Sequence, residues 1–331
     1  MKSPKRDTLP RSAMKLLCTL LGIILVFLLG TTAALQQLLD QIHYTPAATP
    51  IKNSALSIYS AVTLTELSGK NKSETIGGAG SDIINILLIG QDGREGEEGS
   101  RSDSMILCTF HRKTKQVTMT SFLRDLYVKI PGHSANRINA AYSLGGTSLL
   151  DQTLSENFSL HIDGNVEVDF TQFSGIVDAL GGVELELRQD EADFINRETG
   201  SQLEEGLQSL NGEQALMYSR IRKLDLDGDM SRTNRQRKVI NALLQRYKNT
   251  SITKLLPTLN KLMPMITTDM NQGQILLCAM EVLPYLADAQ IISQSVPAEG
   301  SYRDEIIDGM SVLVTDTKTA TEQLRSSLLD K

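Results

Sequence analysis

The strongest constraint on this chain is an uncharged stretch near its amino end. Residues 16–35 read LLCTLLGIILVFLLGTTAAL, which is long enough to cross the hydrocarbon core of a membrane as one helix. The residues before it hold five basic side chains and one acid, Asp7. Because basic residues beside a span stay in the cytoplasm, we expect residues 1–15 to be a cytoplasmic tail and the chain after residue 35 to lie outside the cytoplasm.

The same stretch has a second interpretation. A cleaved signal peptide also begins with basic residues and an apolar core, and Thr32, Ala33 and Ala34 offer the small residues of a cleavage site. The apolar core of a signal peptide is usually about 7–15 residues long, shorter than this run. The length therefore favours a retained, single-pass anchor in the cytoplasmic membrane.

Composition limits the class of the remaining chain. Of 331 residues, 40% are apolar and 22% are charged, which suits a globular protein with a large core. The net charge of −6 excludes a general nucleic-acid binder, which would carry a broad basic surface. Any basic site must therefore be local.

The chain after residue 35 divides into a stalk and a body. Residues 36–81 contain the proline-bearing HYTPAATP and the polar SGKNKSETIGGAGSD, which are typical of an extended linker. The body, residues 82–331, begins with the apolar run IINILLIG, which predicts a strand buried on both faces. The segments SMILCTFH and QVTMTSFL read as two more strands, joined by the turn RKTK.

Strands and helices alternate through the rest of the body. FTQFSGIVDALGG has an apolar helical stripe and ends at a glycine pair. Asn211 is a good N-cap for the next helix, and Asp316 for the last one. The alternation predicts a layered α/β/α domain with a central mixed sheet.

The cysteines leave two alternatives. Cys18 lies in the predicted span, whereas Cys108 and Cys278 lie in apolar surroundings of the body. A disulfide between the last two is compatible with an extracytoplasmic location. Buried free thiols are the simpler interpretation, since spacing alone does not establish pairing.

Two aspartates stand at the ends of neighbouring predicted strands. Asp92 follows the first strand, and Asp103 precedes the second, between Arg101 and Ser104. Carboxylates that converge there would suit Mg²⁺, with Mn²⁺ as the alternative metal. The competing interpretation is that both are turn residues, because aspartate is common where strands end.

Arginines gather in YSRIRKLDLDGDMSRTNRQRKVI, residues 218–240. Tyr218, Arg220 and Arg222 alternate, which would place them on one face of an extended segment. In the helix that follows, Arg232, Arg235 and Gln236 share the apolar, core-facing stripe. One residue further, Arg237 is turned about 100° away, and we expect it to be a solvated surface charge.

These arginines need negative charge, because an unpaired buried charge is very costly. Asp229 near the helix start supplies one negative charge and cannot balance four arginines. Guanidinium groups match phosphate oxygens, and a helix N-terminus adds N–H donors. The pattern therefore predicts a ligand with more than one phosphate. The chain as a whole contains no GxSxG, GxxxxGK[ST] or HExxH motif, so no motif of a common enzyme type is present.

Seven motifs, in this order, connect the body with a known family: NILLIGQDGR, RSDSMIL, SFLRDLYVKIPG, RINAAYSLGG, VDFTQFSGIVDALGGVELEL, LNGEQALMYSRIRK and GDMSRTNRQRKVINALL. Together they resemble the LytR–CpsA–Psr family of cell-wall glycopolymer transferases, over about three quarters of the chain. Leu123 replaces the usual proline before the arginine, and GDMSR replaces the usual GDFGR. Neither departure removes a charged group.

The resemblance implies a Mg²⁺-dependent phosphotransferase. Such an enzyme moves a glycan phosphate from a polyprenyl-pyrophosphate carrier to peptidoglycan, typically to a muramic acid hydroxyl, and releases polyprenyl phosphate. The implied metal ligands are Asp92 and Asp103. The implied pyrophosphate-binding residues are Arg101, Arg124, Arg220, Arg222, Arg232 and Gln236. From the helix phase, Arg235 either contacts the same ligand or neutralises an aspartate of the site.

Catalysis is then expected from Asp103, Arg124, Asp229 and Arg232. The arginines would stabilise the charge on the leaving polyprenyl phosphate, and Asp229 or Asp103 would accept the proton of the acceptor hydroxyl. The family holds its lipid in an apolar cleft, which residues 170–180 would line if they are not plain core. Two alternatives are a pyrophosphatase acting on the same lipid and a non-catalytic lipid-binding or regulatory protein.

Overall fold

The computed structural model describes residues 43–44, 75–78, 80–91, 102–225, 228–247, 261–282, 285 and 289–329. The predicted tail, the predicted membrane anchor and most of the predicted stalk lie outside these residues. Asp92 and Arg101 also lie outside them. Within the described ranges, no helix combines the length and the apolar character needed to span a membrane.

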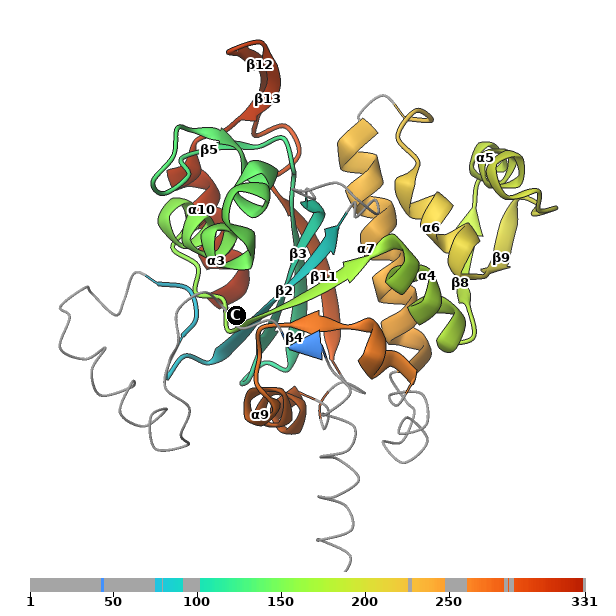
Figure 1. The fold of residues 1–331 in the computed structure, drawn as a ribbon, viewed down its shortest axis with the longest axis horizontal. Coiled ribbons are helices and arrows are strands. Elements are labelled where there is room, and N and C mark those ends of the chain that lie inside the picture. Colours follow the sequence, from blue (N-terminus) through green and yellow to red (C-terminus); the bar gives the residue numbers. More distant parts are fainter. Residues whose placement is uncertain are drawn as a thin grey trace, which may run out of the picture.

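A seven-stranded mixed sheet forms the centre of the domain (Figure 1). Its middle strands are β2 (Ile83–Gln91), β3 (Ser102–His111) and β4 (Gln116–Phe122), each antiparallel to the next. Parallel strands flank them, β7 (Gly164–Asp169) beside β2 and β11 (Gln290–Val296) beside β4. The short strands β10 (Thr267–Thr268) and β1 (His43–Tyr44) extend the sheet beyond β7. The predicted mixed sheet is confirmed.

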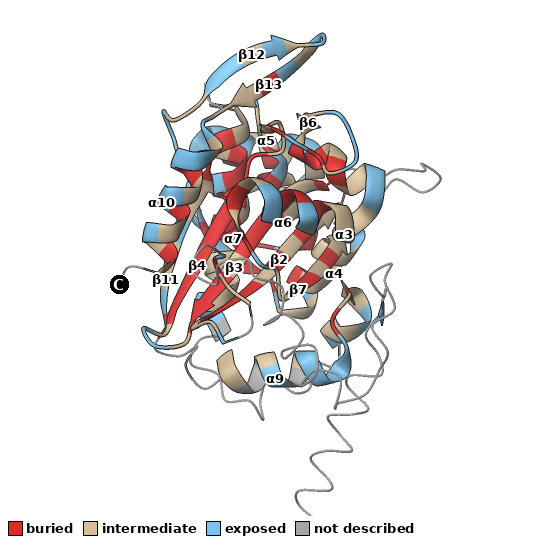
Figure 2. Cartoon of the chain, turned by 90° about the vertical axis from the view of Figure 1, so that its left-hand side faces the viewer, coloured by how far each residue is buried: buried red, intermediate tan, exposed pale blue. Residues whose placement is uncertain are grey.

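The central strands form because their side chains are buried on both faces, as continuous apolar runs predict. Figure 2 shows that β2, β3 and β4 lie in the interior, and β4 is buried at all of its seven positions. The predicted turn of residues 112–115 joins β3 to β4, and Lys115 takes a left-handed φ of 59° there.

Helices α3 (Ile138–Phe158) and α10 (Thr317–Leu329) cover one face of the sheet (Figure 1). The helices and strands meet in one large core of fully buried side chains. Its members include Leu87, Leu107, Phe122, Leu154 and Leu324.

Further helices lie beyond the other face of the sheet (Figure 1). They are α4 (Phe170–Ala179), α5 (Gln189–Thr199), α6 (Gly212–Arg220) and α7 (Gly228–Tyr247), with the hairpin of β8 (Val183–Leu187) and β9 (Gly206–Leu210). This group has its own core, in which Val177, Tyr218 and Val239 are fully buried. Helices therefore lie on both sides of the sheet.

The remaining elements are peripheral. They are α9 (Gln272–Val282), η1 (Met263–Met265), the pair β5 (Tyr127–Val128) and β6 (Asn136–Arg137), and the hairpin β12 (Arg303–Ile307) and β13 (Met310–Val314).

The predicted helix caps are confirmed. The side chain of Asn211 accepts a hydrogen bond from the N–H of Gln214 at 2.9 Å. Asp316 accepts one from the N–H of Lys318 at 3.0 Å. Gly181 and Gly182, with φ of 79° and 83°, follow α4 at the predicted stop.

The extended segment predicted for residues 218–222 is wrong in its first half. The capped helix α6 continues to Arg220, because no helix-breaking residue interrupts it. Tyr218 is therefore fully buried while Arg220 is exposed, so these two residues do not share a face.

Cys108 and Cys278 are both free thiols, which decides between the two alternatives left by the sequence. Burial raises the pKa of Cys108 to about 12. A thiol in that state is a poor nucleophile, since the thiolate is the reactive form.

Candidate active site

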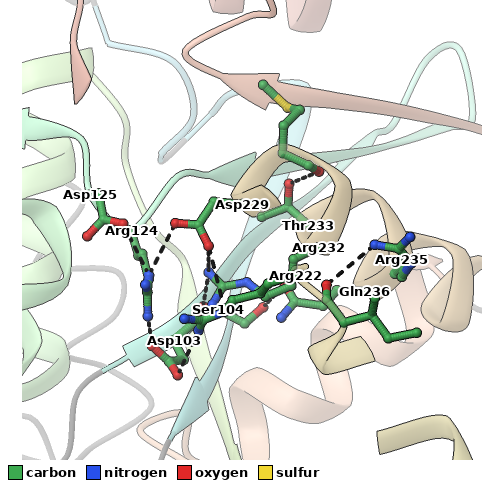
Figure 3. Close-up of polar contacts among 12 residues, drawn as sticks. Asp103, Ser104, Arg124, Asp125, Arg222, Asp229, Arg232, Thr233, Arg235 and Gln236 are labelled. Carbon is green, nitrogen blue, oxygen red and sulfur yellow. Dashed lines mark hydrogen bonds and ion pairs between the residues drawn. The ribbon is translucent and has the colours of Figure 1, made fainter. Parts of the chain in front are cut away.

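Three aspartates and three arginines converge at one end of the central sheet (Figure 3). They are Asp103 of β3, Arg124 and Asp125 just after β4, Arg222 between α6 and α7, and Asp229 and Arg232 in the first turns of α7. The antiparallel register explains part of this arrangement. Ile106 pairs with Ser121, so the same register carried three residues further brings Asp103 opposite Arg124.

Arg124 lies at the centre of the cluster. Its Nη1 lies 2.9 Å from Asp103 Oδ1, and its Nε lies 3.3 Å from Asp125 Oδ2 and 3.5 Å from Asp229 Oδ2. Arg137 of β6 holds the other oxygen of Asp125, at 3.4 Å. One guanidinium thus fixes the positions of three carboxylates.

Arg222 and Arg232 differ in how tightly they are held. Arg222 approaches Asp103 Oδ2 at 3.6 Å and Asp229 Oδ1 at 3.8 Å, and its side chain is 40% exposed. Arg232 is only 2% exposed, and its Nη2 lies 3.3 Å from both Asp229 Oδ1 and the carbonyl oxygen of Asp103. The Nε of Arg232 is buried without a hydrogen-bond partner among the described residues. The cluster therefore presents one exposed guanidinium and one unsatisfied buried donor.

The carboxylates of the cluster titrate differently from one another. Burial opposes the charge of Asp229, but Arg232, a hydrogen bond from Asp125, Arg124 and Arg222 together hold the pKa of Asp229 below its ordinary value. Burial raises the pKa of Asp125, and its hydrogen bond to Asp229 adds to this. Asp229 is thus the more acidic partner of the pair and stays ionised more readily.

The arginines respond to the same surroundings. Burial lowers the pKa of Arg232 to about 10, against the attraction of Asp229. Burial also opposes the charge of Arg124, but Asp229, Asp103 and Asp125 raise its pKa. Both side chains therefore carry a positive charge at neutral pH.

The large charge deficit expected from the sequence is wrong for the described residues. Four arginines, counting Arg137, meet three aspartates, so the excess of positive charge is smaller than that of four arginines against one aspartate. From the sequence only Asp229 lies near these arginines, because Asp103 and Asp125 are far from them along the chain. The case for an anionic ligand now rests on the exposed Arg222 and the unsatisfied donor of Arg232.

Gln236 and Arg220 lie beside the cluster rather than within it. Ser104 Oγ donates to Gln236 Oε1 at 3.0 Å, which joins α7 to β3. The guanidinium of Arg220 lies over the ring of Phe170, 4.5 Å from its centre. On the same helix as Phe170, Val177 belongs to the core, while Phe173 packs against it. Core packing therefore accounts for that part of the 170–180 stripe.

Arg235 does not join the cluster. It points away from the other arginines (Figure 3), and its Nε lies 2.8 Å from Glu191 Oε1, while its Nη2 pairs with Asp225. Arg235 and Glu191 are both nearly inaccessible, with 4% and 5% of their side chains exposed. Arg235 thus fits neither alternative given by the sequence: among the described residues it neutralises carboxylates, but Glu191 and Asp225 are not aspartates of the cluster.

Arg237 is not the solvated surface charge that the helix phase predicts. It is only 6% exposed, and its Nη1 donates to the carbonyl oxygen of Gln294 at 2.8 Å. The helix phase is right that Arg237 faces away from the stripe of Gln236. However, the edge strand β11 covers that side of α7, which the sequence of one helix does not reveal.

The residues present fit a magnesium site only in part. Asp103 offers a carboxylate that is 22% exposed, and Mg²⁺ commonly uses one or two carboxylates with water and phosphate oxygens. Gln91, the last residue of β2, pairs with Ser102 beside Asp103. Asp92, the predicted second ligand, lies outside the described residues. Within the described part, no three His, Cys, Asp or Glu side chains, the three aspartates of the cluster included, are placed so that they could hold one metal ion.

Sequence reasoning did not assign Asp125 and Arg137 to the site. The sequence places Asp125 directly after Arg124, a pattern typical of an exposed ion pair, but its side chain is only 17% exposed and contacts both Arg124 and Arg137. The adjacent RD pair was the available signal. For Arg137 the available signal was its place at the start of the motif RINAAYSLGG, but its contact with Asp125 depends on the pairing of β5 with β6.

The chain matches the model of the LytR_cpsA_psr family over residues 53–327. It is 38% identical over 179 residues to a protein of Bacillus subtilis named polyisoprenyl-teichoic acid–peptidoglycan teichoic acid transferase TagT, a match that covers 52% of this chain and 55% of the relative. It is 31% identical over 256 residues to TagU of Bacillus licheniformis, which bears the same transferase name, with 77% and 76% covered. The matched part thus spans about half the length of the first relatives.

Solved structures share the fold. TagT bound to LIIa-WTA has a TM-score of 0.63 at 27% identity, over 79% of this chain and 96% of that one. The B. subtilis protein YwtF (TagT) with bound octaprenyl pyrophosphate lipid has a TM-score of 0.59 at 26% identity, over 77% and 95%. These similarities agree with the arrangement of the sheet and its helices.

Proposed function

The chain belongs to the LytR–CpsA–Psr family, and on this basis we propose that it is an extracytoplasmic phosphotransferase of the cell wall. It moves a glycopolymer from a polyprenyl-pyrophosphate carrier onto peptidoglycan, at a muramic acid hydroxyl, and releases polyprenyl phosphate. The names of its relatives and the octaprenyl pyrophosphate bound by one structural neighbour support this proposal.

The single observation that carries the proposal is the cluster around Arg124. The pyrophosphate binds between Arg222, which is exposed, and Arg232, which has an unsatisfied donor. Guanidinium groups in a partly buried site bind phosphate oxygens strongly. Arg101, Arg220 and Gln236 complete the proposed binding set.

Asp103, together with Asp92, is proposed to hold Mg²⁺ or Mn²⁺, which would supply further neutralisation of the pyrophosphate charge. The remaining chemistry belongs to side chains of the cluster. Arg124 keeps Asp103 and Asp229 apart and in place through its contacts at 2.9 and 3.5 Å. This preorganisation matters because phosphoryl transfer depends mainly on positioning and charge.

In the proposed reaction, the acceptor hydroxyl oxygen bonds to the phosphorus that carries the glycan. The bond from that phosphorus to the bridging oxygen breaks, and the bridging oxygen leaves with polyprenyl phosphate. Arg222 and Arg232 stabilise the negative charge that collects there. The hydroxyl proton passes to a carboxylate, for which Asp229 is one candidate. Burial opposes the charge of Asp229, but Arg232, Asp125, Arg124 and Arg222 hold its pKa below the ordinary value, so it is ionised and able to accept a proton. Asp103 is the other candidate for the base.

The test uses the full chain in detergent with a short lipid-linked glycan and a peptidoglycan fragment, with Mg²⁺ or with a chelator. We expect a glycan-phosphate linked to peptidoglycan and one polyprenyl phosphate released per linkage. Phosphate release without linkage would instead show a pyrophosphatase. Binding without any turnover would show a non-catalytic lipid-binding protein.

We also propose that residues 16–35 anchor the protein in the cytoplasmic membrane, with residues 36–331 outside. The basic flank and the long apolar run support this topology. Protease added to intact protoplasts should remove the body. Recovery of a protected full-length chain would contradict the proposed topology.

A further inference from the structure

A second polar site lies along α7, on a different face from the cluster. A cavity of about 340 Å³ opens between α7, the edge strand β11 and the segment around Arg188. All ten residues that line it are polar or charged. A cavity lined only by polar and charged residues suits a hydroxylated or ionic ligand better than a lipid chain.

The charges that line the cavity are predominantly positive. Four cations, Arg188, Arg235, Arg237 and Lys238, face two carboxylates, Glu191 and Asp225. Both carboxylates are already engaged. Glu191 and Asp225 pair with Arg235, and Asp225 also lies 2.9 Å from Arg188 Nη1. The positive charge of Arg237 and Lys238 is therefore not balanced within the lining.

Arg237 is the unusual member of this set. Its side chain bonds to the carbonyl oxygen of Gln294 and to the side-chain oxygen of Asn234, and neither partner carries a charge. Among the described residues, no carboxylate approaches it within ion-pair distance, unlike Arg232 and Arg235, the other buried arginines of α7. Burial alone lowers its pKa, to about 10. A buried guanidinium without a counter-charge is costly unless an anion completes its surroundings.

Hydrogen-bonding groups surround these cations. Asn241 and Ser293 line the cavity, and Asn241 Oδ1 is buried without a partner among the described residues. Guanidinium and ammonium groups bind phosphate esters, whereas amide and hydroxyl groups bind sugar or polyol hydroxyls. The lining therefore matches a ligand that contains both kinds of group.

We propose that this cavity binds a sugar-phosphate or polyol-phosphate unit of the glycopolymer donor, beyond the sugar next to the pyrophosphate. This inference rests on the proposed function, because that function supplies a polymeric donor. The segment between α6 and α7 borders both sites, with Arg222 in the cluster and Asp225 in the cavity. The lining residues of α7 run from Ser231 to Asn241, roughly 15 Å at the rise of a helix. A donor with several repeats is long enough to reach both sites.

The test compares two donors on the full chain in detergent: a lipid-linked disaccharide without phosphate repeats, and the same lipid carrying several glycerol phosphate repeats. For Arg237→Gln we expect the KM of the repeat-bearing donor to rise roughly tenfold, as the loss of a charged hydrogen bond predicts. For the exposed Lys238→Gln we expect a rise of about threefold. Neither variant should raise the KM of the disaccharide donor by more than about twofold. Lys318→Gln, an exposed lysine of α10, is the matched control.

Arg237→Gln alters a buried residue, so Lys238→Gln keeps the test decisive if the first variant melts early. Equal KM changes for both donors, or a rise confined to the peptidoglycan acceptor, would overturn the inference. A separate titration of wild-type chain with a glycerol phosphate oligomer, followed by calorimetry, needs no turnover. Binding that Lys238→Gln weakens supports the cavity even if transfer itself fails, and binding that neither variant changes contradicts it.

Discussion

Two arginines of α7 are buried to almost the same degree and sit in different surroundings. Arg232 and Arg235 are 2% and 3% exposed. Arg235 pairs with two carboxylates, and one of them, Glu191, is only 5% exposed. Arg232 keeps an unsatisfied Nε, and its partner Asp229 is 26% exposed beside the still more exposed Arg222. Burial of an arginine therefore does not identify a functional site, whereas an open set of partners with unused donors does.

The largest effect is expected for Arg235, the arginine whose partners are carboxylates outside the cluster. Arg235→Ala leaves the buried Glu191 with only the half-exposed Arg188, whose Nη2 lies 4.0 Å from Glu191 Oε1. Breaking a buried pair in this way costs about 3–5 kcal/mol. We expect a clear fall in the free energy of unfolding, measured by urea denaturation of the full chain in detergent. A variant with wild-type stability that has lost transfer activity would instead indicate that Arg235 contacts the pyrophosphate.

For the cluster around Arg124, we expect a substitution to change the dependence of transfer on Mg²⁺ rather than the stability of the fold. Asp103→Asn removes the negative charge of the proposed metal ligand and keeps its shape. We expect the Mg²⁺ concentration for half-maximal transfer to rise at least ~10-fold, since carboxylate oxygens supply the main protein ligands of Mg²⁺. The control is Asp304→Asn, because Asp304 is exposed on β12. Asn165→Asp is not used as a control, because Asn165 is fully buried. An unchanged Mg²⁺ dependence would remove Asp103 from the metal site.

A further effect concerns the dependence of transfer on pH. Because the folded pKa of Asp229 is lowered, its ion pairs stabilise the protein above the ordinary value of 3.8 and are lost as pH falls through the lowered folded pKa. If Asp229 is the base, the acid limb of the transfer profile should lie below pH 3.8 in the range where the fold persists. Asp229→Asn should remove that limb together with most of the activity. An acid limb that stays in place in this variant would assign the base to Asp103.

Much of the fold could be predicted because its signals are local. The buried strands β2 to β4 are continuous apolar runs, and Asn211 and Asp316 mark helix starts by their side-chain chemistry. The antiparallel order of β3 and β4 also brings Asp103 and Arg124 to one edge of the sheet. These parts of the cluster follow from neighbouring segments of the chain.

The rest depends on contacts between distant segments. Arg237 is buried because β11, more than fifty residues later, covers its side of α7. The positive charge of Arg235 is neutralised by Glu191, which belongs to α5. The phase of a helix predicts which residues share a face, but it does not predict whether a second element covers the opposite face.

The most direct test of the account is the binding of a polyprenyl pyrophosphate to the full chain in detergent, without acceptor. Arg222→Ala removes an arginine that is 40% exposed, so the melting temperature should hardly change. Arg197→Ala, which removes an arginine that is 65% exposed beside Glu198, is the matched control. The account predicts at least ~10-fold weaker binding for Arg222→Ala, as the loss of a charge-assisted contact to phosphate implies, and unchanged binding for Arg197→Ala. Equal affinities of the two variants would contradict a pyrophosphate site at the head of α7.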